Sequence, residues 1–381
     1  MRLLVLDTYH GGSHAAFMRG WAARSRHEHA LLGLPGYHWK WRMRHAPITF
    51  AEEVAARWSA GERWDAIVAT DMLDLAGFIG LAPRGVAALP RLVYFHENQL
   101  TYPVRHHDPR DLHFAWTNIT TCLAADAVVF NSAYHRDVFL AAADALAAKM
   151  PDHRPRGAAA AIRGRASVVP PGIDAPSVVA ATPREPGPLR VLWPHRWEYD
   201  KDPAAFFAAI TAAREAGAEL RLIVVGKSFR GVPEVFARAR EEHAAIIERW
   251  GYVEDHADYR RLLARADVVV STAAHEFFGI AVVEAVAAGA FPVVPPRLAY
   301  PETLGPPEAR PEFFYDGTTA GLAARLVALA RDPAALWGRE GGEAARERIA
   351  GYLWPVVAEA LDRRCEALAE VSADVDGARR P

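Results

Sequence analysis

Short runs of apolar residues alternate along the chain with longer, alanine-rich stretches of helical character. Such continuous apolar runs are typical of parallel strands that are buried on both faces, and their alternation with helices predicts βαβ units. We therefore expect an α/β protein with parallel sheets. The predicted strands are residues 3–6, 66–69, 91–95, 127–130 and 167–169 in the first half, and 190–193, 221–225, 247–251, 268–271 and 292–294 in the second.

The alternation lapses between residues 175 and 188, where four prolines stand among alanines and a threonine. A chain of 381 residues is also longer than a single hydrophobic core usually supports. We therefore expect two doubly wound, Rossmann-like domains, 1–178 and 188–360, with a C-terminal helix and tail at 361–381.

Composition narrows the class of protein. Hydrophobic residues make up 51% and the formal net charge is -2, which excludes a disordered chain and a uniformly basic nucleic-acid binder but allows a local basic patch. The two cysteines, Cys122 and Cys365, suit a reducing compartment. No apolar run reaches the roughly 20 residues of a membrane span. These features predict a cytoplasmic protein without a membrane partner.

Charged residues follow two of the strands predicted in the second half. Arg196 and Lys201 come after 190–193, where two cations could neutralise a diphosphate; incidental charges on a solvated loop are the alternative. Glu276 and Glu284 come after 268–271. Glu284 stands among apolar helical residues and needs a partner such as a ribose diol, because burial of an unpaired carboxylate is costly. The alternative is a helix-capping Glu276 with a Glu284 that reaches solvent.

Together, these two pairs resemble the donor-site signature of retaining GT-B glycosyltransferases of family 4. The resemblance implies two Rossmann-like domains that face each other across a cleft. It also implies that Arg196 and Lys201 hold a nucleotide diphosphate, that Glu276 contacts the donor sugar and that Glu284 binds the ribose. The donor-binding residues expected on this basis are Gly11, Gly12, Arg196, Lys201, Glu276, Phe278, Gly279, Ile280 and Glu284.

Polar segments also follow strands of the first half. Gly11 and Gly12 come after the first strand and allow a tight turn, before a helix expected from about Ala15. His96 follows 91–95, where a histidine of family 4 enzymes lies near the reacting centre; a structural histidine satisfied by the backbone is the alternative. The neighbouring Glu97, Asn98 and Gln99 could contact acceptor hydroxyls.

Aromatic and basic residues alternate between Tyr37 and His45. Such interleaving supplies phosphate contacts and stacking platforms for unpaired bases, although a half-buried edge strand has the same alternation. Further cations between 105 and 113 could extend this patch.

These segments, with 130–132 and 170–174, resemble the tRNA-queuosine α-mannosyltransferases over most of the chain. The resemblance implies transfer of mannose from GDP-mannose to the cyclopentenediol of queuosine in the tRNA-Asp anticodon. No metal is expected, because Arg196 and Lys201 supply the charge. The alternatives are a family 4 enzyme with another donor and a small-molecule, lipid or polysaccharide acceptor, and a non-catalytic sugar-nucleotide or RNA-binding protein.

The roles implied by this resemblance fall into two groups. The expected catalytic residues are His96, Arg196, Lys201 and Glu276. The expected acceptor or tRNA contacts are Ser13, His14, Trp39, Lys40, Trp41, Arg42, Arg44, Glu97, Asn98 and Gln99.

Overall fold

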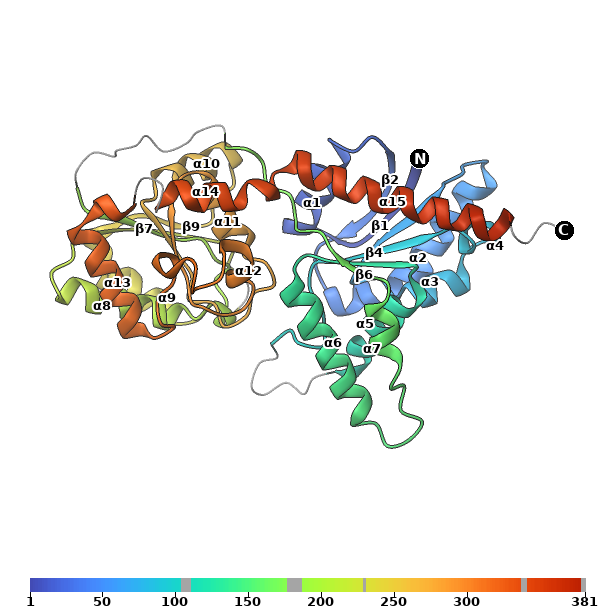
Figure 1. Cartoon of the computed structure of the whole chain (residues 1–381), viewed down its shortest axis with the longest axis horizontal. Helices are drawn as coiled ribbons and strands as arrows, with labels where there is room; N and C mark the ends of the chain where they lie inside the picture. Colours follow the sequence, from blue (N-terminus) through green and yellow to red (C-terminus); the bar gives the residue numbers. More distant parts are fainter. Residues whose placement is uncertain (104–110, 177–186, 229–230, 337–340, 378–381) are drawn as a thin grey trace. The chain divides into compact units, whose positions relative to one another are not determined.

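The computed structural model describes residues 1–103, 111–176, 187–228, 231–336 and 341–377 (Figure 1). The chain divides into two compact units. Unit 1 comprises Met1–Gly172 with Trp354–Pro381, and unit 2 comprises Ile173–Leu353. Each contains one parallel sheet flanked by helices, which confirms the predicted α/β class. Most of the expected linker, at 177–186, lies outside the described residues.

The division of the chain differs from the predicted bounds of 1–178, 188–360 and 361–381. Helix α15 (Trp354–Gly377) begins seven residues before position 361 and belongs to unit 1 from its first residue. Trp354 explains this placement, because its ring fills the space beside two glycines of unit 1. A Cβ atom on Gly20 or on Gly172 would lie 2.2 Å from that ring. Residues 354–360 therefore complete unit 1, not the second domain.

The sheet of unit 1 has six parallel strands in the order β2-β1-β3-β4-β5-β6. Five match predicted strands, whereas β2 was not predicted. Strand β2 lies at the edge of the sheet, where exposed positions tolerate polar residues, so its sequence contains only a short apolar run. The strands are β1 (Arg2–His10), β2 (Glu28–Pro35), β3 (Ala66–Thr70), β4 (Arg91–Phe95), β5 (Ala127–Phe130) and β6 (Ala166–Val168).

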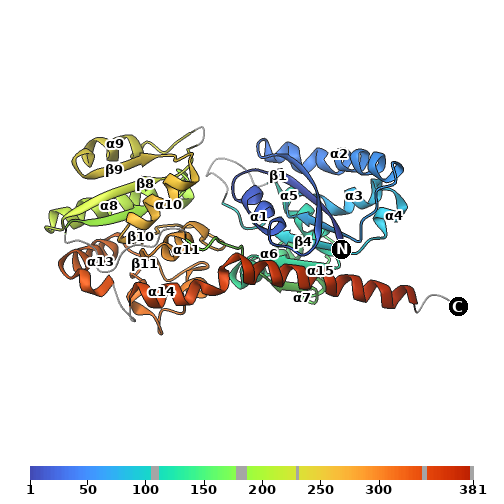
Figure 2. The same ribbon diagram turned by 90° about the horizontal axis from the view of Figure 1, so that it is seen from above.

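Alternate residues of these strands face two separate cores. Leu3 and Val5 pack under α1 (Gly12–Ala22) and α15, which lie side by side (Figure 2). Leu4 and Leu6 face the opposite layer. That layer contains α2 (Trp39–Ser59), α3 (Leu75–Leu81), α4 (Arg84–Ala87), α5 (Leu112–Ala124), α6 (Ala133–Ala148) and α7 (Ala158–Arg163).

The sheet of unit 2 has five parallel strands in the order β11-β10-β7-β8-β9. They are β7 (Leu189–Trp193), β8 (Leu220–Val225), β9 (Ile247–Gly251), β10 (Val268–Val270) and β11 (Phe291–Val293). All five were predicted to within a residue or so. The helices are α8 (Pro203–Glu215), α9 (Val235–Glu242), α10 (His256–Arg265), α11 (Ile280–Ala287), α12 (Tyr300–Leu304), α13 (Thr319–Arg331) and α14 (Gly342–Ile349).

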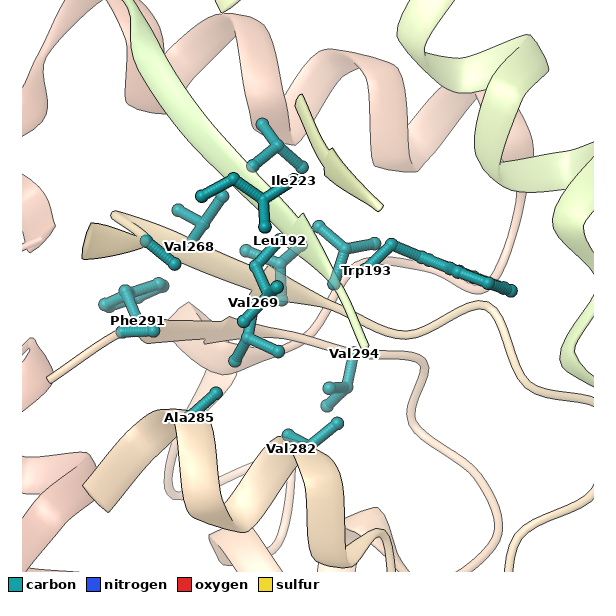
Figure 3. Close-up of a cluster of buried hydrophobic side chains, with 14 of the residues drawn as sticks. Leu192, Trp193, Ile223, Val268, Val269, Val282, Ala285, Phe291 and Val294 are labelled. Atoms are coloured by element: carbon teal, nitrogen blue, oxygen red, sulfur yellow. The ribbon is translucent and has the colours of Figure 1, made fainter. Parts of the chain in front are cut away.

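Apolar packing of α11 against this sheet positions the segment that precedes the helix. Val282 and Ala285 point from α11 toward the sheet residues Val269, Phe291 and Val294 (Figure 3). All five side chains are fully buried or nearly so. The N-terminus of α11 is thereby held at a fixed place on the sheet.

None of the helices in the described part of the chain is both long enough and apolar enough to cross a membrane.

Candidate active-site residues

In each unit, two neighbouring strands lead to segments that diverge from the sheet. Strands β7 and β10 are neighbours, and the chain passes from β7 to β8 on one side of this pair and from β10 to β11 on the other. In unit 1, β1 lies in the same way between β2 and β3. Ligands of open α/β sheets bind beyond the carboxyl ends of strands at such switch points. Most of the predicted site residues come from segments at these two places.

Lys201 lies at the switch point of unit 2. Its side chain is buried, and its Nζ donates to the His275 carbonyl at 2.6 Å and to Glu276 Oε2 at 3.3 Å. Asp200 Oδ2 lies 3.1 Å from the same nitrogen. The segments after β7 and β10 are also joined through the backbone, since Thr272 Oγ1 donates to the Lys201 carbonyl at 2.8 Å. The structure thus brings together Lys201 and Glu276, which are 75 residues apart in the sequence.

Glu276 is an ionised carboxylate in this setting. Burial opposes its charge, but the Lys201 ammonium, together with His195, His275 and Arg196, outweighs burial and lowers the pKa of Glu276 to about 2. The expectation that Glu276 caps a helix is wrong, because α11 begins at Ile280 with Gly279 as its N-cap. A carboxylate that stays charged at neutral pH can accept hydrogen bonds from sugar hydroxyls.

Arg196 has a different environment from Lys201. Its side chain is 42% exposed, and its Nη2 lies 3.4 Å from Glu198 Oε2. Salt bridges this exposed contribute little to stability. Of the two predicted cations, one is therefore on the surface and the other is held between two carboxylates.

The segment before α11 is fixed by tight backbone packing. Gly279 has φ +88°, and a Cβ atom there would lie 2.8 Å from the Tyr300 ring. Only glycine adopts this conformation without strain. Phe278 is buried edge-on against Tyr352, with ring centroids 5.1 Å apart. The backbone N–H groups of the first turn of α11, which begins at Ile280, lie at the positive end of the helix dipole. This end of the helix therefore favours a bound anion.

Glu284 has a partner that the sequence did not predict. Tyr259, on α10, donates its hydroxyl to Glu284 Oε2 at 3.3 Å. Burial raises the pKa of Glu284 to about 7, and the Tyr259 hydrogen bond opposes that rise. Glu284 is partly exposed and hydrogen-bonded within the fold, whereas the alternative considered only that it reaches solvent. Its predicted role as a ribose ligand stays a prediction.

Carboxylates and histidines gather at the switch point of unit 1. Asp7 is buried in β1, Asp71 directly follows β3, and His96 directly follows β4. The predicted glycine-rich loop is shorter than expected, because β1 continues to His10 and α1 already begins at Gly12. Gly11 alone separates the two elements. Ser13, on the first turn of α1, is exposed.

His14 is held close to Asp7. Its Nδ1 lies 3.8 Å from Asp7 Oδ1, while His10 Nδ1 lies 2.8 Å from the other oxygen, Oδ2. Burial opposes a charge on His14, but Asp7 and Asp71 outweigh it and raise the pKa of His14 to about 9. The cation in turn helps to hold the pKa of Asp7 well below its usual range.

The backbone of His96 is anchored on both sides, and its ring is enclosed by other rings. Its N–H donates to Asp71 Oδ1 at 2.9 Å, and its carbonyl accepts from Asn131 Nδ2 at 2.9 Å. The imidazole lies 4.1 Å from the His14 ring and 4.8 Å from the Phe17 ring, centroid to centroid. Its Nε2 is buried and has no hydrogen-bond partner among the described residues. The backbone therefore does not satisfy the ring, contrary to the structural alternative.

The predicted acceptor contacts after His96 differ in how exposed their side chains are to solvent. Asn98 is fully buried, and its side chain builds the local turn by accepting from the N–H groups of Leu100 and Thr101. Gln99 Nε2 donates to Glu97 Oε1 at 3.3 Å, and both residues are partly exposed. Glu97 and Gln99 are therefore accessible, whereas Asn98 serves the loop itself.

The aromatic and basic stretch from Trp39 to Arg44 begins α2, so the edge-strand alternative is wrong. Trp39 packs on Phe114 and Arg42 is buried, whereas Lys40, Trp41 and Arg44 are exposed. Most of the further cations expected between 105 and 113 lie outside the described residues.

Four residues of these two clusters were not predicted from the sequence: Asp7, Asp71, Asp200 and Tyr259. Asp7 and Asp71 could have been found from the pattern, because each ends or follows an apolar run. Asp200 could have been found because it directly precedes Lys201 in the sequence. Nothing in the sequence connects Tyr259 with Glu284, since the contact joins α10 to α11.

In the portions of the chain that the structure describes, no three His, Cys, Asp or Glu side chains are grouped so that they could hold a metal ion.

Comparison with known proteins connects these clusters to a family. Residues 2–173 match the family described as tRNA-queuosine alpha-mannosyltransferase N-terminal, and residues 189–332 match glycosyl transferases group 1. A tRNA-queuosine alpha-mannosyltransferase of Drosophila melanogaster is 31% identical over 310 residues, which cover 79% of this chain and 81% of that protein. The chain belongs to the tRNA-queuosine alpha-mannosyltransferase family.

Solved structures agree on the fold of this family member. Sucrose-phosphate synthase from Thermosynechococcus elongatus has a TM-score of 0.70 at 16% identity, covering 97% of this chain and 99% of that one. HepE from Anabaena, in complex with UDP, has a TM-score of 0.67 at 16% identity, covering 96% and 99%. The two parallel-sheet units therefore form the GT-B fold expected from the sequence. The match specific to queuosine mannosyltransferases covers the first of the two stretches that form unit 1, and the general glycosyltransferase match lies in unit 2.

Proposed function

We propose that this chain transfers mannose from GDP-mannose to the cyclopentenediol of queuosine in the anticodon of tRNA-Asp, with retention of configuration. Family membership supports the sugar and the acceptor. The observation that carries the chemistry is the partly buried contact between Lys201 and the ionised Glu276 at the switch point of unit 2. Because the acceptor is a tRNA, we place the reaction in the cytoplasm.

Arg196 and Lys201 stabilise the leaving group in this proposal. The bond between the sugar C1 and the diphosphate oxygen breaks, and its electron pair stays on the phosphate. The exposed Arg196 guanidinium binds this anion from the solvent side. Electrostatic stabilisation of this kind is usually the largest contribution to catalysis. Two protein cations carry the charge, so the proposed reaction requires no divalent ion.

Lys201 Nζ donates hydrogen bonds to the His275 carbonyl and to Glu276, and it forms an ion pair with Asp200. A bound diphosphate competes with these three contacts. The contact of Lys201 with Glu276 Oε2 is the longest of the three, at 3.3 Å, against 2.6 Å for the His275 carbonyl and 3.1 Å for Asp200. We infer that the diphosphate replaces Glu276. The displaced carboxylate then accepts hydrogen bonds from the donor sugar.

The acceptor hydroxyl attacks C1 from the face that the diphosphate leaves. Its proton passes to the departing phosphate oxygen, which balances the step without a separate base. His96 contacts the reacting sugar as a neutral imidazole, because burial and the neighbouring His14 cation hold the pKa of His96 well below its usual range.

Incubation with queuosine-containing tRNA and GDP-mannose, followed by nucleoside mass spectrometry, tests this function. We expect one hexose on queuosine and none on the same tRNA that carries guanosine instead. Absence of the hexose, with GDP binding retained, would overturn the proposed substrates and favour another donor and a small-molecule acceptor. Absence of both transfer and nucleotide binding would favour a non-catalytic role.

A further inference from the structure

Two exposed aromatic rings mark the beginning of α2. Tyr37 is 54% and Trp41 is 61% exposed. Trp39, between them, turns inward and packs on Phe114, with ring centroids 5.1 Å apart. Of the three aromatic residues in this stretch, Trp39 therefore packs inside the protein, whereas Tyr37 and Trp41 face solvent.

A hydrogen-bonded pair, Arg42 and His45, supports both exposed rings. Arg42 Nη1 and His45 Nε2 lie 2.9 Å apart. The Arg42 guanidinium lies 4.8 Å from the centroid of the Tyr37 ring, and the His45 ring lies 5.0 Å from that of Trp41 at an interplanar angle of 33°. Each exposed ring is thus backed by a planar side chain of the protein.

The supporting pair is itself held in place. Arg42 Nε donates to the Pro35 carbonyl at 3.1 Å, and His45 Nδ1 lies 2.8 Å from Thr49 Oγ1. Arg42 is buried, so this pair is not a flexible surface contact. Two ordered aromatic platforms lose little conformational entropy when a flat ligand stacks on them.

The charged side chains that the start of α2 presents around the platforms are positive. No acidic residue occurs in the sequence between Glu28 and Glu52, whereas Lys40 and Arg44 are exposed on the same turn of α2. Arg44 also lies 3.5 Å from Asp111, which compensates part of its charge. This surface is complementary to a polyanion and unfavourable for pairing with a second copy of itself.

The platforms lie close to the carboxyl end of β1. Gly36, directly before Tyr37, packs against Gly11, so that a Cβ atom on Gly36 would lie 2.8 Å from the Gly11 Cα. Gly11 is the turn that leads into α1 and to His14, which stacks on His96. A ligand on the platforms therefore borders the candidate site of unit 1.

We propose that Tyr37 and Trp41 stack on unpaired bases of the tRNA anticodon loop, with Lys40 beside the phosphate backbone. Stacking needs an accessible base face, which a loop offers and a duplex does not. This inference rests on the proposed function for the identity of the RNA. It assigns binding of the loop to Tyr37 and Trp41, and it leaves Trp39 and Arg42 as supporting residues of the fold.

The test measures binding of a fluorescent anticodon stem-loop, and of its stem duplex alone, to Tyr37→Ala and Trp41→Ala. We expect the Kd for the stem-loop to rise about tenfold in each variant, from the usual energy of base stacking on an aromatic ring. The weaker binding of the duplex should not change. Trp41→Phe, which keeps a ring, should restore most of the affinity.

Leu81→Ala is the matched control, since Leu81 is 57% exposed and ends α3 away from the platforms. It should bind like the wild type. An unchanged Kd for the stem-loop in folded Trp41→Ala would overturn the inference. A wild-type dimer in sedimentation experiments that becomes a monomer in Trp41→Ala would also overturn the inference, because the platforms would then be a protein interface.

Failure of this inference is distinguishable from failure of the proposed function. Wild-type protein that adds a hexose to queuosine, with the same KM for tRNA in Trp41→Ala, keeps the function and overturns the inference. Wild-type protein that binds the stem-loop in a Trp41-dependent manner but adds no hexose supports the inference and overturns the function.

Discussion

His14 stacks on His96 with ring centroids 4.1 Å apart, and the two imidazoles have opposite protonation states at neutral pH. Carboxylates around His14 raise its pKa to about 9, against the effect of burial. Burial, reinforced by the His14 cation, lowers the pKa of His96. The pair thus places a fixed positive charge directly behind a neutral ring, and it makes unit 1 sensitive to alkaline pH.

Stability of unit 1 should therefore fall in alkaline solution. The folded-state pKa of His14 is raised above its ordinary value of 6.5, so its contribution is fully present below pH 6.5 and is lost as pH rises through about 9. The loss amounts to about 3.5 kcal/mol at most, at about 1.4 kcal/mol per pKa unit. Urea denaturation between pH 6 and pH 9.5 measures it.

His14→Gln should flatten this pH dependence, since the titrating group is gone. His113→Gln is the control, because His113 is an exposed histidine at the start of α5. Parallel pH profiles for the wild type and His14→Gln would contradict the assigned charge state.

Arg196→Ala should cost activity without cost to folding. The Arg196 side chain is 42% exposed, and its ion pair with Glu198 lies within its own loop. We expect kcat to fall by about 10² to 10³, the range found when one charge-stabilising donor is removed from an active site. Steady-state kinetics measure the loss of activity, and a thermal melt of the same preparation checks that folding is unchanged. A lower Tm would show that Arg196 is structural.

Lys201→Met should lose stability as well as activity. It removes the cation that lies between Asp200 and Glu276, 3.1 and 3.3 Å away, and leaves buried carboxylates unpaired. Breaking a buried ion pair in this way costs about 3–5 kcal/mol. The double variant Lys201→Met with Glu276→Gln should regain part of that stability, but none of the turnover. Denaturant titration of the wild type, Lys201→Met and the double variant measures these differences in stability. A Lys201→Met variant as stable as the wild type would contradict the described contacts of Lys201.

Trp354→Ala should destabilise unit 1 by about 3–5 kcal/mol, the usual cost of a large aromatic deletion in a core. Trp354 is 5% exposed and packs on Phe17, with ring centroids 5.7 Å apart. Val356→Ala, two residues later and 54% exposed, is the control and should change little. Equal denaturation midpoints for the two variants would show that α15 is not part of the core.

The sequence predicted the continuous apolar strands well, but it did not predict β2. Strands such as β4 and β8 are continuous apolar runs because both faces are covered, and their ranges follow directly from the pattern. Strand β2 has only one strand neighbour and carries exposed Glu28 and Gly33, so its pattern is indistinct.

The two motifs predicted Lys201 and Glu276 at one donor site, but not the direct contact between them, which exists because β7 and β10 are neighbours in the sheet. The acceptor stretch was harder to interpret. Whether Trp39 or Trp41 faces solvent depends on where α2 begins and on the partner Phe114, which comes from another helix. A list of aromatic and basic residues does not contain that information.

The assignment of α15 to unit 1 has a consequence for the order of events during translation. Unit 1 is built from two separate stretches of the chain, and all of unit 2 is synthesised between them. Domains generally fold as they emerge from the ribosome. The nascent first stretch therefore has the space beside Gly20 and Gly172 unfilled until Trp354 has left the exit tunnel. A premature stop just after Leu353 would release an intact unit 2 joined to an incomplete unit 1.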